Sequence, residues 1–338
     1  MNRFTSFVLL CSLVALASCD STTSGPATVG TTSGGRVFIL NQGNYTHNNA
    51  SLDVWTWKDS LISSDLVSPL GDVGNDLQLI NGKLYAVLDN SSKIVVVNPD
   101  SAADHTVIQF PPFSAPAKIV KSSATEALVP ELYRNEIAVI NLASGTIAST
   151  IPVDSGQYSI AMLSGKAYSA SASGKVLVID PVTKQITKTS AWIDPNPAQI
   201  VADSAHNVLI LATSGDYTTT PGKIYWMDPS TLVLTDSIVL PMTSSFNTMF
   251  IGGNKAYVCF YVQQPQVIDL GTHSMAADPM LTKNYFGGIY DAASKLLYMG
   301  TVSDLIHNDG VDVFDLSSMK LEKSFTAGIA PGFFVVMH

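Results

Sequence analysis

The sequence predicts an all-β fold: a seven-bladed β-propeller with four-stranded blades, closed by pairing of the C-terminal strand with the N-terminal blade. Three observations support this prediction. A turn signature recurs at the period of a propeller blade, and the runs between the turns are short and rich in β-branched and aromatic residues. No long stretch repeats its apolar residues with a helical period.

The repeated signature is an apolar run that ends in Asn or Asp, followed by two residues and then Ser or Thr. The Asn or Asp stands at positions 98, 141, 180, 228, 269 and 315, so successive copies lie 43, 39, 48, 41 and 46 residues apart. Such side chains accept hydrogen bonds from the backbone two residues on and open tight turns. A degenerate copy at Lys58–Ser60, after the run Leu52–Trp57, brings the count to seven.

Each unit divides into four strands, which we name A to D in chain order. In the fourth unit we expect them at residues 197–201, 207–212, 223–227 and 234–240. The first unit begins with a B strand, Arg36–Leu40, and Pro331–His338 matches an A strand with nothing after it. The last strand should therefore pair with the first unit and close the ring, which protects the sheet edges.

The two faces of this ring are expected to differ. The A–B and C–D turns are short and form a plain face, whereas the D–A and B–C loops are longer, rich in aromatic residues, and form an aromatic face. Loops on a rigid scaffold often bind ligands, and a concave aromatic surface suits a sizeable organic molecule. The alternative is that these aromatic rings only pack the loops together. The candidate ligand-binding residues are Tyr45, His47, Tyr133, Arg134, Tyr158, Trp192, Tyr217, Tyr261, Tyr285, Phe286 and His307.

The N-terminus predicts export and lipidation. Arg3 provides a basic start, and Phe7–Leu16 is an apolar run that is too short to span a bilayer. The sequence Leu-Ala-Ser-Cys that ends at Cys19 resembles the bacterial lipobox, in which the Cys becomes the lipidated first residue. We therefore expect a signal peptide at 1–18, the lipidated Cys and a flexible tether at 19–35, and the propeller at 36–338, with the membrane contacted through the lipid anchor only.

Charge and motifs exclude several classes of function. The chain has 27 acidic and 18 basic residues, a net charge of −9 and no basic run, so nucleic acid is not an expected partner. It lacks Gly-x-Ser-x-Gly, His-Glu-x-x-His, P-loop and Gly-x-Gly-x-x-Gly motifs.

Asp304–Asp309 could offer metal ligands, but a polar loop accounts for it, and no cofactor or metal is expected. We therefore expect no enzyme. The remaining enzyme hypothesis is a hydrolase or lyase that uses carboxylates of the aromatic face, namely Asp72, Asp76, Glu131, Glu136, Asp154, Asp194 and Asp216.

Three stretches, at residues 37–52, 72–76 and 327–333, resemble a known family when combined with the blade period. This family is the YncE/YVTN-like surface-lipoprotein propellers of Bacteroidetes-type bacteria, and the resemblance covers the whole mature chain. It implies ligand capture at the outer membrane or cell surface, a corrinoid such as cobalamin or another metal chelate as ligand, and a TonB-dependent transporter as partner. The alternatives are an iron-siderophore-binding propeller and an envelope scaffold that binds proteins without a small ligand.

Overall fold

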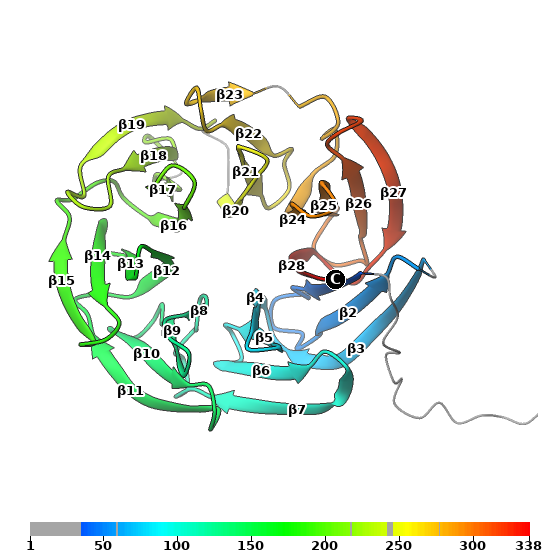
Figure 1. Cartoon of the computed structure of the whole chain (residues 1–338), viewed down its shortest axis with the longest axis horizontal. Coiled ribbons are helices and arrows are strands. Elements are labelled where there is room, and N and C mark those ends of the chain that lie inside the picture. Colours follow the sequence, from blue (N-terminus) through cyan, green and yellow to red (C-terminus); the bar gives the residue numbers. More distant parts are fainter. Residues whose placement is uncertain (1–34, 59, 217, 242–245, 277) are drawn as a thin grey trace, which may run out of the picture.

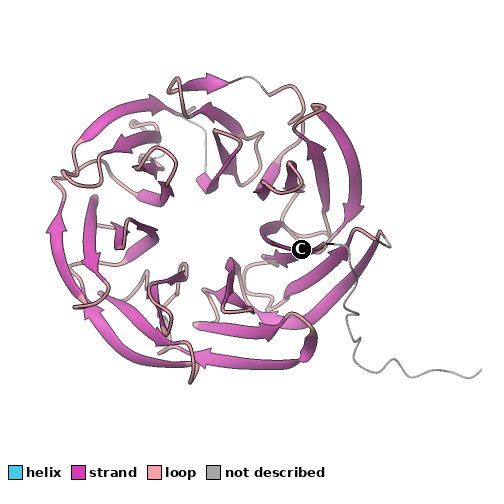
Figure 2. Cartoon of the chain, in the orientation of Figure 1, coloured by secondary structure: helices cyan, strands magenta, loops and turns pink. Residues whose placement is uncertain are grey.

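The chain folds into a seven-bladed β-propeller. The computed structural model describes residues 35–338 except 59, 217, 242–245 and 277, and it contains 28 strands in seven four-stranded sheets around one axis (Figure 1). The described residues include no helix, and therefore none long and apolar enough to cross a membrane (Figure 2). The predicted signal peptide, Cys19 and Tyr217 lie outside the described residues.

The blades follow one another in chain order, each with its A strand at the axis and its D strand at the rim. Blade 1 consists of β28 (Pro331–Met337), β1 (Arg36–Asn41), β2 (Ala50–Thr56) and β3 (Leu61–Gly71). Blade 2 consists of β4 (Gly74–Ile80), β5 (Lys83–Leu88), β6 (Lys93–Asn98) and β7 (Ser101–Gln109), and blade 3 of β8 (Val120–Lys121), β9 (Glu126–Pro130), β10 (Glu136–Asn141) and β11 (Thr146–Pro152). Blade 4 consists of β12 (Gln157–Leu163), β13 (Lys166–Ser171), β14 (Lys175–Asp180) and β15 (Gln185–Thr189), and blade 5 of β16 (Pro197–Asp203), β17 (Val208–Thr213), β18 (Lys223–Met227) and β19 (Leu234–Val239). Blade 6 consists of β20 (Phe246–Gly252), β21 (Lys255–Phe260), β22 (Gln266–Asp269) and β23 (Ser274–Ala276), and blade 7 of β24 (Tyr285–Asp291), β25 (Leu296–Thr301), β26 (Gly310–Asp315) and β27 (Lys320–Thr326).

The predicted ring closure is confirmed. Strand β28 pairs antiparallel with β1, with Val37 opposite Val336 and Ile39 opposite Phe334. The last strand of the chain therefore supplies the A strand of blade 1, and the first and last blades become neighbours like any other two (Figure 1).

The hydrophobic core lies between neighbouring blades. In one core cluster, Ile210 and Trp226 of blade 5 pack with Met249 and Val258 of blade 6, and all four are buried. B and C strands are covered on both faces by adjacent sheets, which explains why they are continuously apolar. The D strands face solvent, and every residue of β15 is exposed.

The six signature turns join C strands to D strands as the sequence predicts. In each of them the Asn or Asp side chain accepts a hydrogen bond from the backbone N–H two residues on. In blade 4, for example, Asp180 Oδ1 accepts from the N–H groups of Val182 and Thr183 at 2.9 and 3.1 Å. The local chemistry of the signature therefore produces the turn, as expected for Asx-type geometry.

Candidate functional site

A cleft of about 520 Å³ opens on the aromatic face. The described residues that line it all belong to B–C and D–A segments, which come from blades 1, 2, 3, 6 and 7. The lining residues are Gln42, Gly43, Asn44, Tyr45, His47, Val73, Asp89, Asn90, Ala115, Tyr133, Tyr261, Asp304, Leu305 and Ile306.

Three tyrosines from three different blades converge on this cleft. Tyr45 of blade 1 and Tyr133 of blade 3 are 68% and 73% exposed, so their rings are open to a ligand. Tyr261 of blade 6 is 38% exposed, and its ring packs edge-on against Phe286, with 5.7 Å between the ring centroids. Tyrosine combines an apolar ring face with a polar hydroxyl, so the cleft offers both stacking and hydrogen bonding.

The loop that carries Tyr45 is held in place by hydrogen bonds. The Asp72 carboxylate accepts from the backbone N–H of Thr46, at 3.0 and 2.9 Å to its two oxygens, and from Asn90 Nδ2 at 2.6 Å. Gly43 has φ +79°, and a Cβ there would lie 2.6 Å from the backbone nitrogen of Ala50, so only glycine fits. The cleft wall is therefore largely formed before any ligand arrives.

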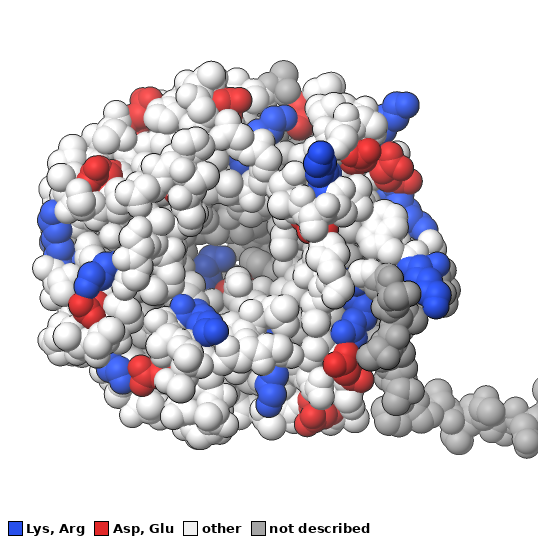
Figure 3. All heavy atoms as spheres, in the orientation of Figure 1, with Lys and Arg blue, Asp and Glu red and all other residues white. Residues whose placement is uncertain are grey.

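A second cavity, the mouth, adjoins the cleft and shares Asp89 and Tyr261 with it. It has a volume of about 260 Å³ and also includes Tyr158. Below it, a channel of about 610 Å³ runs along the axis between the A strands of all seven blades. The view down the axis shows the central opening (Figure 3). The mouth and the channel share Lys118, Gln199, Thr248 and Phe333.

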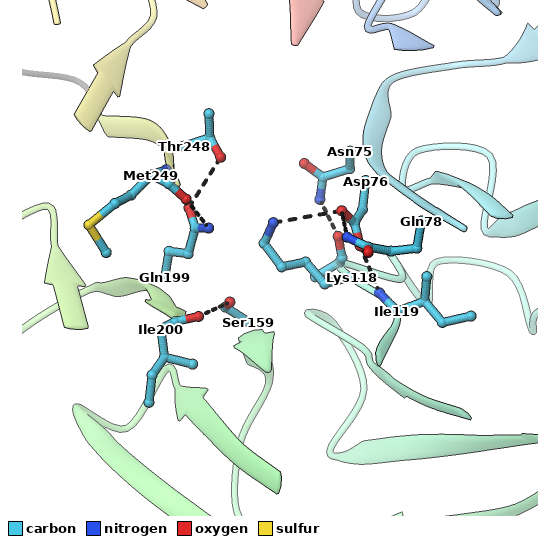
Figure 4. A network of polar contacts seen from close by, with 11 residues as sticks. Asn75, Asp76, Gln78, Lys118, Ile119, Ser159, Gln199, Ile200, Thr248 and Met249 are labelled. Carbon is cyan, nitrogen blue, oxygen red and sulfur yellow. Dashed lines mark hydrogen bonds and ion pairs between the residues drawn. The ribbon is translucent and has the colours of Figure 1, made fainter. Parts of the chain in front are cut away.

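Polar side chains around the top of the channel connect neighbouring blades (Figure 4). Asp76 Oδ2 of blade 2 accepts from the backbone N–H of Ile119 in blade 3 at 3.0 Å. Gln199 of blade 5 accepts from the backbone N–H of Met249 and donates to its carbonyl, both at 2.8 Å. These side chains connect one blade to the next, so the polar groups at the top of the channel have hydrogen-bond partners within the ring.

Two carboxyl groups near the site resist ionisation. Burial raises the pKa of Asp89 to about 6, and the nearby Asp72 charge adds to the shift. Burial also raises the pKa of Glu131 to about 7, with a further contribution from Glu136. Glu131 is 1% exposed, and its Oε2 lies 3.6 Å from Arg134 Nε, too far for a hydrogen bond.

The structure brings together five of the predicted ligand-binding residues and separates most of the others. Tyr45, His47, Tyr133 and Tyr261 line the cleft, and Tyr158 lines the mouth. Tyr217 lies outside the described residues.

The other five predicted residues line neither cavity. Arg134 donates a hydrogen bond to Glu136, and its Nε lies 3.6 Å from the Glu131 carboxyl group. His307 is exposed and contacts Asp304, and Trp192 is exposed and lies over Gly174. Tyr285 and Phe286, the first residues of β24, are buried in the packed interior. The Tyr285 hydroxyl donates a hydrogen bond to Asp312, and the Phe286 ring packs against the ring of Tyr261.

The carboxylates of this face hold loops and strands in place. Asp194 accepts from the Tyr225 hydroxyl and pairs with Lys223, and Asp216 accepts from the backbone N–H groups of its own loop. Across residues 35–338, apart from the positions left undescribed, no group of three His, Cys, Asp or Glu side chains is placed to hold a metal ion.

The two charged residues of the mouth, Asp89 and Lys118, were not among the sequence candidates. Asp89 lies in the short turn between β5 and β6, whereas the sequence candidates lie on longer loops. Lys118 precedes the two-residue strand β8, whose weak pattern gives little indication of an A strand. Aligning the A strands would have found Lys118, because it occupies the place that Asp76, Ser159 and Gln199 hold in other blades.

Comparisons with known proteins agree with the fold. The family model described as "Domain of unknown function (DUF5074)" matches residues 35–249. No curated protein matches the chain. Similar solved structures include hydrazine synthase from Kuenenia stuttgartiensis, with a TM-score of 0.65, 13% identity, and coverage of 77% of this chain and 88% of that one. Apo AztD from Citrobacter koseri has a TM-score of 0.58, 11% identity, and coverage of 90% and 98%. A chain from a mitotic checkpoint complex has a TM-score of 0.60, 13% identity, and coverage of 77% and 80%. At these identities the similarity concerns the fold alone.

Proposed function

The chain belongs to the DUF5074 family, and we propose that it is a non-enzymatic propeller that captures an extended organic ligand at the cleft and mouth of its aromatic face. The observation that carries this proposal is the convergence of Tyr45, Tyr133 and Tyr261, from three blades, on one cleft of about 520 Å³. Cavities of this size are typical of small-molecule sites.

The shape and chemistry of the site support an extended ligand. The cleft continues into the mouth and then into the channel, so a bound molecule could fill one cavity and reach into the next. The exposed tyrosine rings would stack on a flat or apolar part of the ligand, while the hydroxyl groups and the His47 ring would bond its edge. Since the loops are already hydrogen-bonded to one another, little ordering should accompany binding.

The non-enzymatic part of the proposal rests on what the carboxylates do. Asp72 fixes the Tyr45 loop, Asp76 connects two blades, and Asp194 is bonded to Tyr225 and Lys223. Each of these three is engaged in a structural contact. Asp89 lines both cavities and is the carboxyl group that a bound ligand could reach, but no second carboxyl group that could act with it lines the cleft or the mouth among the described residues except Asp304, which is bonded within its own loop.

Corrinoids are the first ligand class to test, and iron siderophores are the second. Both follow from the family resemblance given above. The same resemblance and the lipobox at Cys19 support a lipid-anchored protein of the outer membrane or cell surface that delivers its ligand to a TonB-dependent transporter. In this proposal the aromatic face would be the surface that meets the transporter.

Calorimetric titration of residues 20–338 with cyanocobalamin and with a ferric siderophore tests this function. We expect saturable heat with one of the two. The substitutions Tyr45→Ala, Tyr133→Ala and Tyr261→Ala should each weaken binding about tenfold, the typical loss when an aromatic contact is removed. Phe113→Ala is the matched control, because Phe113 is 85% exposed and lines neither cavity. If neither ligand gives a heat of binding, both ligand classes are ruled out.

A further inference from the structure

One charged side chain at the floor of the mouth forms only a long ion pair, with Asp76 at 3.9 Å, and does not connect its blade to the next one. At the equivalent place in three other blades, Asp76, Ser159 and Gln199 each hydrogen-bond the backbone of the following blade. Lys118 of blade 3 makes no such bond. Its side chain instead extends into the space between the strands (Figure 4).

The Lys118 ammonium keeps its hydrogen-bond donors available. Its Nζ lies 3.9 Å from Asp76 Oδ1, beyond hydrogen-bonding distance, and 5.6 Å from the centroid of the Phe333 ring. No hydrogen bond to this nitrogen occurs within the part of the chain that the structure describes. Asp76 accepts hydrogen bonds from Gln78 and Ile119 instead, so its contact with Lys118 is an ion pair without a hydrogen bond.

The position of this ammonium directs it toward a ligand. Lys118 lines both the mouth and the channel, and its side chain is 19% exposed. Of the described residues that line the mouth, Lys118 is the only basic one, and Asp89 is the only acidic one. A cation that is partly withdrawn from water in a restricted cavity attracts an anion more strongly than one on an open surface.

We propose that Lys118 forms a subsite for an anionic group of the captured ligand, a carboxylate, phosphate or sulfonate, at the entrance to the channel. The proposal rests on the proposed function, and it adds that the ligand is oriented with its acidic group toward the axis and its apolar part toward the tyrosines. The contact is a charge-assisted hydrogen bond from Nζ to an anionic oxygen.

A matched pair of fluorescent probes tests this subsite without knowledge of the natural ligand. The dye 8-anilinonaphthalene-1-sulfonate carries a sulfonate, and N-phenyl-1-naphthylamine is the same aromatic frame without it. Residues 20–338 should bind the sulfonate probe at least about tenfold more tightly, as a hydrogen bond to a charged group typically provides. Lys118→Met should abolish this preference, and Lys118→Arg should retain most of it.

The controls separate this inference from the proposed function. Lys83→Met removes an exposed lysine at the start of β5, on the plain face, and should leave the preference unchanged. Melting curves of both Lys118 variants check that the fold is intact. A preference that survives Lys118→Met, or equal binding of the two probes by the wild type, would overturn the subsite. If cyanocobalamin and the siderophore give no heat but the preference depends on Lys118, the subsite stands and those ligand classes fall.

Discussion

Glu131 is a buried carboxyl group in the loop that carries Tyr133. Its pKa is raised from 4.5 to about 7, chiefly by burial, so the folded state holds its proton more tightly than the unfolded chain does. The stability that this proton contributes is therefore fully present below pH 4.5 and is lost as the pH rises through 7. The Oε2 atom, which has no hydrogen-bond partner, fits a group that is neutral in the folded protein.

Glu131→Gln should remove this pH dependence, because the amide has the same shape and does not ionise. Between pH 4.5 and pH 8 the wild type should lose on the order of 3 kcal/mol of unfolding free energy that the variant retains. The difference in unfolding free energy, variant minus wild type, should therefore rise by this amount. Urea denaturation at a series of pH values measures the difference. Glu322→Gln, at an exposed position of β27, is the control and should show no such change. Parallel curves for the wild type and Glu131→Gln would mean that folding does not raise the pKa of Glu131.

At the residue scale, the sequence predicted the aromatic face better than the individual contacts. Tyr158 and Phe286 stand at the same place, the second residue of an A strand, yet Tyr158 lines the mouth and Phe286 is covered by Tyr261. Tyr261, which covers Phe286, belongs to the B–C loop of blade 6, the preceding blade. Strand periodicity indicates which side of a sheet a residue faces, but it contains no information about which loop covers it.

At the element scale, β28 is the strand on which ring closure depends. It supplies the inner strand of blade 1 and packs against β24 of blade 7. Deleting residues 331–338 should therefore unfold the protein, since it exposes the edge of β1 and the cores on both sides of blade 1. Circular dichroism and thermal melting of the truncated chain measure this. A soluble truncation with a cooperative melting transition would contradict the closure mechanism.

The contact between β28 and blade 7 leaves no room for a side chain. A Cβ on Gly300 would lie 1.8 Å from the carbonyl oxygen of Pro331. Gly300→Ala should therefore push β28 away and lower the free energy of unfolding by about 1–3 kcal/mol, the usual cost of overpacking. Gly271→Ala is the control, because its nearest neighbour is the mobile end of Asn254 at 3.3 Å. Equal urea midpoints for the two variants would show that β28 can move aside for the added methyl group without loss of stability.

Most of the elements could be predicted from the sequence, because the signature turn and the apolar strands are local features. The strands of the unit that carries the Asp228 signature, which forms blade 5, illustrate this: the predicted 223–227 coincides with β18, and the other three agree within two residues. The channel could not be predicted in the same way. Its polar contacts, such as Asp76 to Ile119 and Gln199 to Met249, join residues more than 40 positions apart in different blades.

At the scale of the whole molecule, the two faces have separate tasks. The plain face contains the signature turns, which are satisfied by their own side chains, whereas the cleft depends on loops from five blades. The first and last strands of the propeller meet at blade 1: a Cβ on Gly35, the first described residue, would be 3.3 Å from the carbonyl oxygen of Met337. A short linker could therefore join them, and the ring could be opened elsewhere.

Two circular permutants test this division. The first permutant opens the ring between Ser144 and Gly145, in a signature turn of the plain face. It should keep its melting temperature within a few degrees and should still bind the ligand or probe, because an exposed tight turn contributes little to the rest of the structure. The second permutant opens the ring between Val262 and Gln263, next to Tyr261. It should keep the fold but bind at least about tenfold more weakly, because the loop that carries Tyr261 is then cut and no longer holds this ring in the cleft. Equal binding by both permutants would place the ligand outside the cleft and mouth, and loss of binding by both would show that the two faces are coupled through the ring.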